Sequence, residues 1–202
     1  TVTIFVLYKV GTVITMLRNS IEGLDSVIKS EIPRNSVILI AGSPGSLKSG
    51  MTYSMLSNHL KQTDEVGIYI TLEESTLSHL KNMQSLNIEI PDNLIISDYT
   101  DIRDRFEKNK NPNIVDMITT SINYFRSKYK ERFTMMALDS LNALYALIDT
   151  SDLRVKMFHF LKGLRHLNVT SFIIMEIPEF NKLPEYMGSE SFLVDGIIRT
   201  GD

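Results

Sequence analysis

The residues Val37–Leu60, VILIAGSPGSLKSGMTYSMLSNHL, constrain the fold of this chain more than any other stretch. A continuous apolar run is followed by a loop of glycine, serine and proline, and then by apolar residues at helical spacing. Within the loop, Gly42, Lys48 and Ser49 stand at the first, seventh and eighth positions of the pattern G-x-x-x-x-G-K-[ST], and Gly45 lies between them. This order predicts a buried strand, a phosphate-binding loop and a helix.

A loop of this kind binds phosphate through backbone N–H groups, and its glycines allow the chain to curl tightly enough to aim them inward. The Lys48 ammonium would then reach the β and γ phosphates, and the Ser49 hydroxyl would reach Mg²⁺. Leu47 departs from the pattern, because it occupies the place of the glycine before the lysine. Taken alone, the loop fits both a nucleotide site and an ordinary turn. The candidate nucleotide-binding residues are Gly42, Ser43, Pro44, Gly45, Ser46, Leu47, Lys48 and Ser49.

Further apolar runs alternate with stretches of helical periodicity along the rest of the chain. The runs that predict strands are Val66–Leu72, Leu94–Ile96, Phe133–Leu138, Val169–Met175 and a final segment that starts at Gly196. Alternation of this kind favours an α/β fold, with a mainly parallel central sheet and helices on both faces. A length of 202 residues suits one such domain. We therefore expect a single domain over residues 1–202, with residues 1–11 adding an extra N-terminal strand.

Acidic residues follow several of the predicted strands, at the edge of a parallel sheet where ligands bind. Asp139 follows a strongly apolar strand and is a candidate Mg²⁺ ligand together with Ser49. Glu73 and Glu74 follow another strand and are candidates for the general base that orients water. Each has a simpler interpretation as a helix cap or as a partner of a helix dipole. Glu176 is interpreted as a surface or supporting residue.

Charge and composition narrow the class of partner. The net charge of −3 gives no overall basic field that would attract nucleic acid. The basic residues of the segment 103–110 are interleaved with acidic ones, so we interpret that segment as a solvated loop. The absence of cysteine excludes disulfides and thiolate metal sites. No apolar run approaches the roughly 18 residues of a membrane span. We expect a cytoplasmic protein with no membrane or nucleic-acid partner.

Four segments together carry a family resemblance over about residues 21–199. They are SIEGLDSVI (Ser20–Ile28), GIYITLEES (Gly67–Ser75), FTMMALDSLNAL (Phe133–Leu144) and ESFLVDGII (Glu190–Ile198). In these segments the chain resembles the KaiC-like (circadian-clock-type) group of RecA-superfamily P-loop ATPases. The resemblance implies a RecA-like P-loop NTPase fold, ATP and Mg²⁺ as ligands, and homo-oligomers, often hexameric rings with ATP between subunits.

The same resemblance implies roles for individual residues. It makes residues 42–49 the P-loop, Glu73 and Glu74 the source of the catalytic carboxylate, and Asp139 the Walker B residue. The chain departs from the family pattern in three places. Leu47 replaces a glycine, and a left-handed backbone there would cost leucine about 1–2 kcal/mol. Residues 30–32 replace a Gly-Gly pair before a proline, which affects a turn.

The third departure concerns the end of the chain. No basic segment of the kind that supplies an arginine finger to a neighbouring subunit follows the Gly196–Arg199 segment, so the C-terminus is interpreted as truncated. Three functions remain open on this basis. The first is an ATP-binding protein with a regulatory or signalling role and an ATPase activity weakened by Leu47. The second is a degenerate interaction protein that keeps the fold without the nucleotide. The third is a recombinase-like DNA-associated protein.

Overall fold

The computed structural model describes residues 3–6, 13–14, 17, 20–28, 31–100, 113–148, 153–177 and 193–201. One segment interpreted from sequence, the mixed-charge segment 103–110, lies outside these residues. Within the described part of the chain, no helix has both the length and the apolar character needed to cross a membrane.

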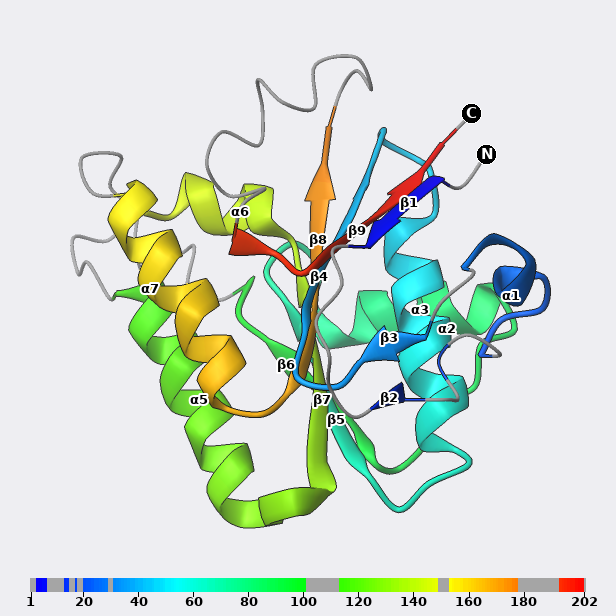
Figure 1. The fold of residues 1–202 in the computed structure, drawn as a ribbon, viewed down its shortest axis with the longest axis horizontal. Coiled ribbons are helices and arrows are strands. Elements are labelled where there is room, and N and C mark those ends of the chain that lie inside the picture. Colours follow the sequence, from blue (N-terminus) through cyan, green and yellow to red (C-terminus); the bar gives the residue numbers. More distant parts are fainter. Residues whose placement is uncertain are drawn as a thin grey trace.

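The main sheet has seven strands in the order β1-β9-β4-β8-β7-β5-β6 (Figure 1). Their bounds are β1 Thr3–Val6, β4 Val37–Gly42, β5 Val66–Thr71, β6 Leu94–Asp98, β7 Phe133–Asp139, β8 Thr170–Glu176 and β9 Gly196–Thr200. The pairings from β9 through β6 are all parallel, whereas β1 pairs antiparallel with β9. The predicted N-terminal strand therefore exists over Thr3–Val6 and extends the edge of the sheet.

Helices cover both faces of this sheet, as predicted. Figure 1 places α2 and α3 on one side of the sheet, and α5 and α7 on the other. The bounds are α1 Leu24–Val27, α2 Lys48–Leu60, α3 Thr76–Ser85, α5 Ile114–Tyr129, α6 Leu141–Ala146 and α7 Leu153–His166, with a 3-10 turn η1 at Lys130–Arg132. The prediction of an α/β fold with a mainly parallel sheet is confirmed.

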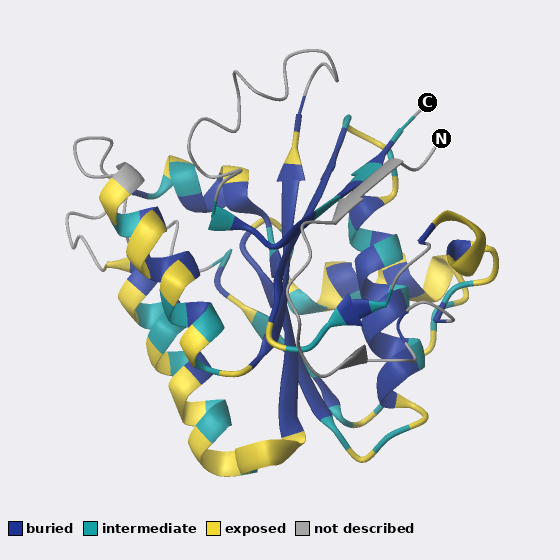
Figure 2. Cartoon of the chain, viewed as in Figure 1, coloured by how far each residue is buried: buried dark blue, intermediate teal, exposed yellow. Residues whose placement is uncertain are grey.

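The central strands are apolar throughout because both of their faces are covered. Every residue of β4 and β5 is buried (Figure 2). Along β4 the side chains alternate between two cores, with Val37 and Leu39 in one and Ile38 and Ile40 in the other. This burial on two sides explains why the strands read as continuous apolar runs rather than as alternating patterns.

Some elements were not predicted from the sequence. The six-residue helix α6 is too short to show helical periodicity, and the hydroxyl of Ser140 caps it by accepting a hydrogen bond from the Ala143 backbone N–H. A second sheet consists of two short strands, β2 Val13–Ile14 and β3 Ile32–Pro33. Strands of two residues, one of them containing proline, leave no pattern in a sequence.

A polar network joins several elements at the amino ends of β5 and β7. The Glu65 carboxylate accepts hydrogen bonds from Arg34 Nη2 and Thr134 Oγ1, both at 2.8 Å. The imidazole Nε2 of the buried His59 lies 2.8 Å from Glu65 Oε2. Burial alone would raise the pKa of the Glu65 carboxyl, but these hydrogen bonds outweigh it and hold that pKa below its usual value.

The lowered pKa of Glu65 predicts how the stability of the protein depends on pH. A carboxyl group with a lowered pKa stabilises the fold above its unfolded pKa, and this contribution is lost as the pH falls through the folded pKa. We expect Glu65→Gln to lower the free energy of unfolding by about 1–3 kcal/mol at neutral pH. It should also flatten the loss of stability below about pH 4.5. Urea unfolding across this pH range measures both effects.

Glu89→Gln is the matched control for that experiment. Glu89 also forms a carboxylate ion pair, with Lys61, but its side chain is 78% exposed. Exposed pairs contribute little to stability, so this variant should unfold like the unaltered protein. If Glu65→Gln lost stability in acid as steeply as the unaltered protein, the proposed role of Glu65 would be wrong.

Candidate nucleotide-binding site

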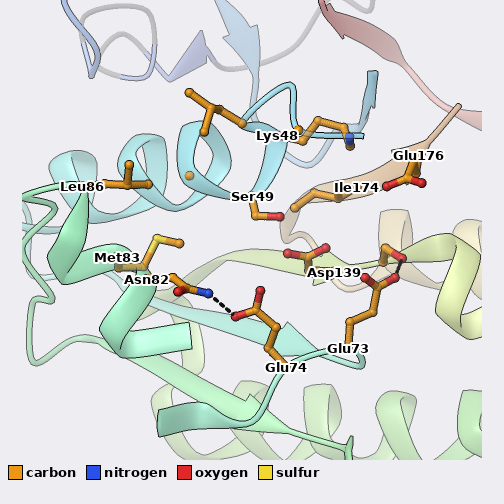
Figure 3. A pocket seen from close by; sticks show the side chains of 14 residues that line it. Lys48, Ser49, Glu73, Glu74, Asn82, Met83, Leu86, Asp139, Ile174 and Glu176 are labelled. Carbon is orange, nitrogen blue, oxygen red and sulfur yellow. Dashed lines mark hydrogen bonds between the residues drawn. The ribbon is translucent and has the colours of Figure 1, made fainter. Parts of the chain in front are cut away.

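The carboxyl ends of four parallel strands bring the predicted site residues to one edge of the sheet. In the strand register, Gly42 at the end of β4 is opposite Glu176 of β8, and Thr71 at the end of β5 is opposite Asp139 of β7. The loop that follows β4 leads into α2. Figure 3 shows Lys48 and Ser49 above Asp139, Glu73 and Glu74, all around one pocket.

The pocket is lined by most of the residues that the sequence singled out. Its lining comprises Gly45, Leu47, Lys48, Ser49, Gly50, Glu73, Glu74, Asn82, Met83, Leu86, Asp139, Ser140, Ile174 and Glu176. The remaining loop candidates, Gly42, Ser43, Pro44 and Ser46, do not line it. Glu176, interpreted from sequence as a surface or supporting residue, lies on the wall of this pocket.

The loop is held by its own side chains and by strand β9. The Lys48 ammonium donates to the backbone carbonyl of Ser43 at 2.7 Å, across the turn. The hydroxyls of Ser46 and Thr200 lie 2.8 Å apart. A Cβ atom at Gly42 would lie only 2.2 Å from Thr200 Oγ1 and 2.4 Å from its carbonyl oxygen. Glycine is therefore required at position 42 because β9 packs directly against the start of the loop.

The first turn of α2 has no side-chain cap. Leu47 occupies the N-cap position and makes no capping hydrogen bond, and the first turn contains no acidic residue. By contrast, Ser75 and Asn113 accept backbone hydrogen bonds at the starts of α3 and α5. The first N–H groups of a helix have no partner within the helix, and together with the helix dipole they attract an anion. This uncapped end faces the pocket and is suited to a phosphate group.

Leu47 has a left-handed backbone, with φ 58° and ψ 26°. Such a conformation costs a non-glycine residue about 1–2 kcal/mol. The side chain is 66% exposed and lies at the rim of the pocket. The glycine-like backbone of the motif is therefore kept, and the leucine side chain is directed mostly to solvent.

Each acidic residue of the predicted site is held by a specific donor. The buried Tyr69 hydroxyl donates to Asp139 Oδ2 at 2.6 Å. The Asn82 amide of α3 donates to Glu74 Oε2 at 2.8 Å, and the Ser140 hydroxyl donates to Glu73 Oε1. Burial and the Asp139 carboxylate raise the pKa of the Tyr69 phenol well above its usual value, so the phenol keeps the proton that it donates.

Lys48 lies among these carboxylates. Burial lowers the pKa of its ammonium group, and the carboxylates of Glu176, Asp139 and Glu73 oppose that effect. The pocket therefore holds four carboxylates and one lysine. A site with this balance of charge suits a polyanion only if a cation accompanies it.

The donors at the site fit Mg²⁺. Ser49 offers a hydroxyl and Asp139 a carboxylate, and oxygen atoms are the ligands that this ion prefers. Among the described residues, no group of three or more histidine or acidic side chains is arranged to hold a metal ion. Magnesium in nucleotide sites is typically bound by one or two protein oxygens, with phosphate and water completing its shell. Ser49 and Asp139 would therefore hold Mg²⁺ together with the phosphates.

Several residues of this site were not predicted from the sequence. Tyr69 lies inside an apolar strand, VGIYIT, and nothing in its position suggested a polar role. Asn82 and Leu86 come from the far end of α3 and just beyond it. Thr200 closes β9 and meets the loop only in the folded protein. Ser140 stood within the quoted LDSL segment, and that segment was the only signal available.

The parallel sheet, the loop between β4 and α2 and the acidic strand ends define an α/β protein of the RecA-like P-loop class. A family model described as "ATPase: KaiC" matches residues 17–201. The chain belongs to this KaiC ATPase family, and the predicted resemblance is confirmed. Membership of the family implies nucleotide binding.

Curated relatives agree with this assignment. The circadian clock oscillator proteins KaiC of Parasynechococcus marenigrum (strain WH8102) and Prochlorococcus marinus (strain MIT 9313) are each 30% identical over 189 residues. The KaiC of Synechococcus elongatus (strain ATCC 33912 / PCC 7942 / FACHB-805) is 26% identical over 192 residues. These matches cover 90–92% of the chain but only 36–37% of each relative. The chain thus spans little more than a third of the length of these relatives.

The left-handed backbone at Leu47 predicts that Leu47→Gly stabilises the fold. Glycine removes the strain of about 1–2 kcal/mol. Glycine also gives the unfolded chain more conformational freedom, and this cancels about 0.5–1 kcal/mol of the gain. We expect a net gain of about 0.5–1 kcal/mol in the free energy of unfolding, measured with urea.

Leu47→Ala is the control for this prediction, because alanine shortens the side chain but keeps the Cβ atom and its strain. It should not gain stability. Equal gains from alanine and glycine would place the strain in the side chain rather than in the backbone.

Proposed function

We propose that this chain binds ATP with Mg²⁺ at the β4–α2 loop and hydrolyses it slowly. One observation carries the proposal. A lysine, a serine hydroxyl and a strand-end aspartate converge at a helix N-terminus that has no side-chain cap. Backbone N–H groups of the loop and of the first turn of α2 would bind the phosphates.

Each charged residue would have a distinct part in this activity. Lys48 would exchange the Ser43 carbonyl for phosphate oxygens, which is a favourable change for a partly buried ammonium group. Ser49 and Asp139 would hold Mg²⁺, which supplies charge stabilisation at the phosphoryl oxygens when bound. Glu73 or Glu74 would accept a proton from the attacking water or orient that water.

The two glutamates are placed differently, which gives them separable roles. Glu73 is exposed, and its charge acts on the Lys48 ammonium. Glu74 is half-buried and is tied to α3 through Asn82. A carboxylate can act as the base only if it is free to face water. Substitution of each glutamate in turn therefore shows which of the two is the base.

A second candidate function is a protein that keeps the fold and acts through interaction alone. The leucine in the loop favours it, since its side chain adds bulk to the pocket lining at a position where the motif has glycine.

We also propose that the chain self-associates, and this part of the proposal rests on the family alone. Light scattering with and without ATP tests whether rings such as hexamers form. A regulatory role would follow from nucleotide-dependent assembly of this kind.

Nucleotide binding can be tested by isothermal titration with ATP and Mg²⁺. We expect measurable binding that Lys48→Ala weakens roughly 10- to 100-fold, because an ammonium–phosphate contact is lost. Lys61→Ala is the matched control, since Lys61 follows the other end of α2 and pairs with Glu89. No heat at millimolar nucleotide would reject the proposal. If Leu47→Gly then restored binding, the interaction-only function would be favoured.

Hydrolysis can be tested by release of phosphate from ATP. Substitution of the true base by glutamine should leave ATP affinity intact and lower the rate by roughly 10²- to 10⁴-fold. We expect this of only one of Glu73→Gln and Glu74→Gln, so each variant serves as the control for the other. Tight binding with no hydrolysis by the unaltered chain would limit the function to binding.

A further inference from the structure

One of the two candidate magnesium ligands accepts a hydrogen bond from a buried hydroxyl group. Tyr69 of β5 is completely buried, and its hydroxyl donates to Asp139 Oδ2 at 2.6 Å. Figure 3 shows Ser49 of α2 and Asp139 of β7 facing each other at the pocket. The Tyr69 hydroxyl therefore fixes one side of the Asp139 carboxylate, opposite the second candidate ligand.

We propose that Tyr69 is a positioning residue for magnesium, holding the Asp139 carboxylate in the geometry that the ion requires. The inference rests on the proposed binding of ATP with Mg²⁺. A hydrogen bond to one carboxylate oxygen fixes the rotation of the group and leaves its second oxygen for the metal. Among the described residues, Tyr69 makes the only side-chain hydrogen bond to the Asp139 carboxylate.

The Tyr69 ring is itself fixed on two sides. The His79 ring of α3 packs against it with ring centroids 4.5 Å apart, and the Tyr53 ring of α2 packs at 5.4 Å. Both neighbours are at most 2% exposed. Because the ring is held by packing, the position of its hydroxyl is set before any ligand binds, which is what a positioning residue needs.

Tyr53 shows that burial of a phenol in this cluster does not by itself produce such a contact. Its hydroxyl is buried and has no hydrogen-bond partner among the described residues. Tyr53 and Tyr69 thus share the same apolar surroundings, and their hydroxyls differ in the contact with Asp139. The chain therefore provides its own matched control.

The test compares Tyr69→Phe with Tyr53→Phe in the full chain. ATP affinity is measured by titration at increasing Mg²⁺ concentrations and again in excess chelator. We expect Tyr69→Phe to raise the Mg²⁺ concentration for half-maximal effect about tenfold. Affinity for ATP without metal should not change, and Tyr53→Phe should match the unaltered protein in both conditions.

Asp139→Asn separates failure of this inference from failure of the proposed function. If Asp139→Asn leaves the Mg²⁺ dependence unchanged, the magnesium site itself is wrongly assigned. If Asp139→Asn shifts it and Tyr69→Phe does not, only the role of Tyr69 is wrong. Combining both substitutions should shift the Mg²⁺ dependence no further than Asp139→Asn alone, because the hydroxyl acts through that carboxylate.

Two other outcomes would overturn the inference. An equal shift from Tyr53→Phe would mean that the whole aromatic cluster, rather than one hydroxyl, governs metal binding. A Tyr69→Phe protein that does not fold would assign the hydroxyl to stability of the fold instead. Urea unfolding of both tyrosine variants distinguishes these outcomes.

Discussion

The parallel pairing of β4 on both of its edges is the constraint on which the site depends. Strand β4 is hydrogen-bonded to β8 on one side and β9 on the other, so its end at Gly42 is fixed in space. The loop that follows must turn at this point, and α2 must begin where the turn ends. The register places Glu176 of β8 opposite Gly42, and Asp139 ends β7 at the same edge, because parallel strands share one carboxyl edge.

The charge at this edge is negative in excess, because carboxylates outnumber the single lysine of the pocket. A triphosphate alone would therefore meet repulsion there. A divalent cation would offset part of this negative charge, and the Ser49 and Asp139 oxygens are suited to it. The uncapped start of α2 adds a positive potential that comes from backbone N–H groups rather than from a side chain. Under the proposed function, this arrangement of charges would favour metal-bound over free nucleotide.

Much of the fold could be predicted from the sequence because its strands are buried on both faces. Such strands appear as apolar runs, and the acidic residues after them indicate the functional edge of the sheet. The short helix α6 and the two-residue strands β2 and β3 were missed, since periodicity needs more residues than these elements contain.

The finer geometry of the site could not be predicted, because it depends on contacts between distant segments. A tyrosine in an apolar strand reads as a core residue, and only the fold brings Tyr69 to Asp139. From sequence, strain at Leu47 could be predicted only for the case of a left-handed backbone. A motif does not fix φ for a residue that departs from it, and the structure supplies that angle. From sequence, the glycine at position 42 is explained by the tight curl of the loop, whereas the structure adds the close approach of Thr200.

The contact between Ser46 and Thr200 has a consequence for how the protein acquires its site. The two hydroxyls are 154 positions apart in the chain, and one belongs to the loop while the other ends β9. Contacts of such long sequence separation form late, because the entropy of closing a long loop opposes them. During synthesis, the loop and α2 emerge long before the strand that packs against them. The loop between β4 and α2 therefore gains its contact with Thr200 only when β9 has joined the sheet.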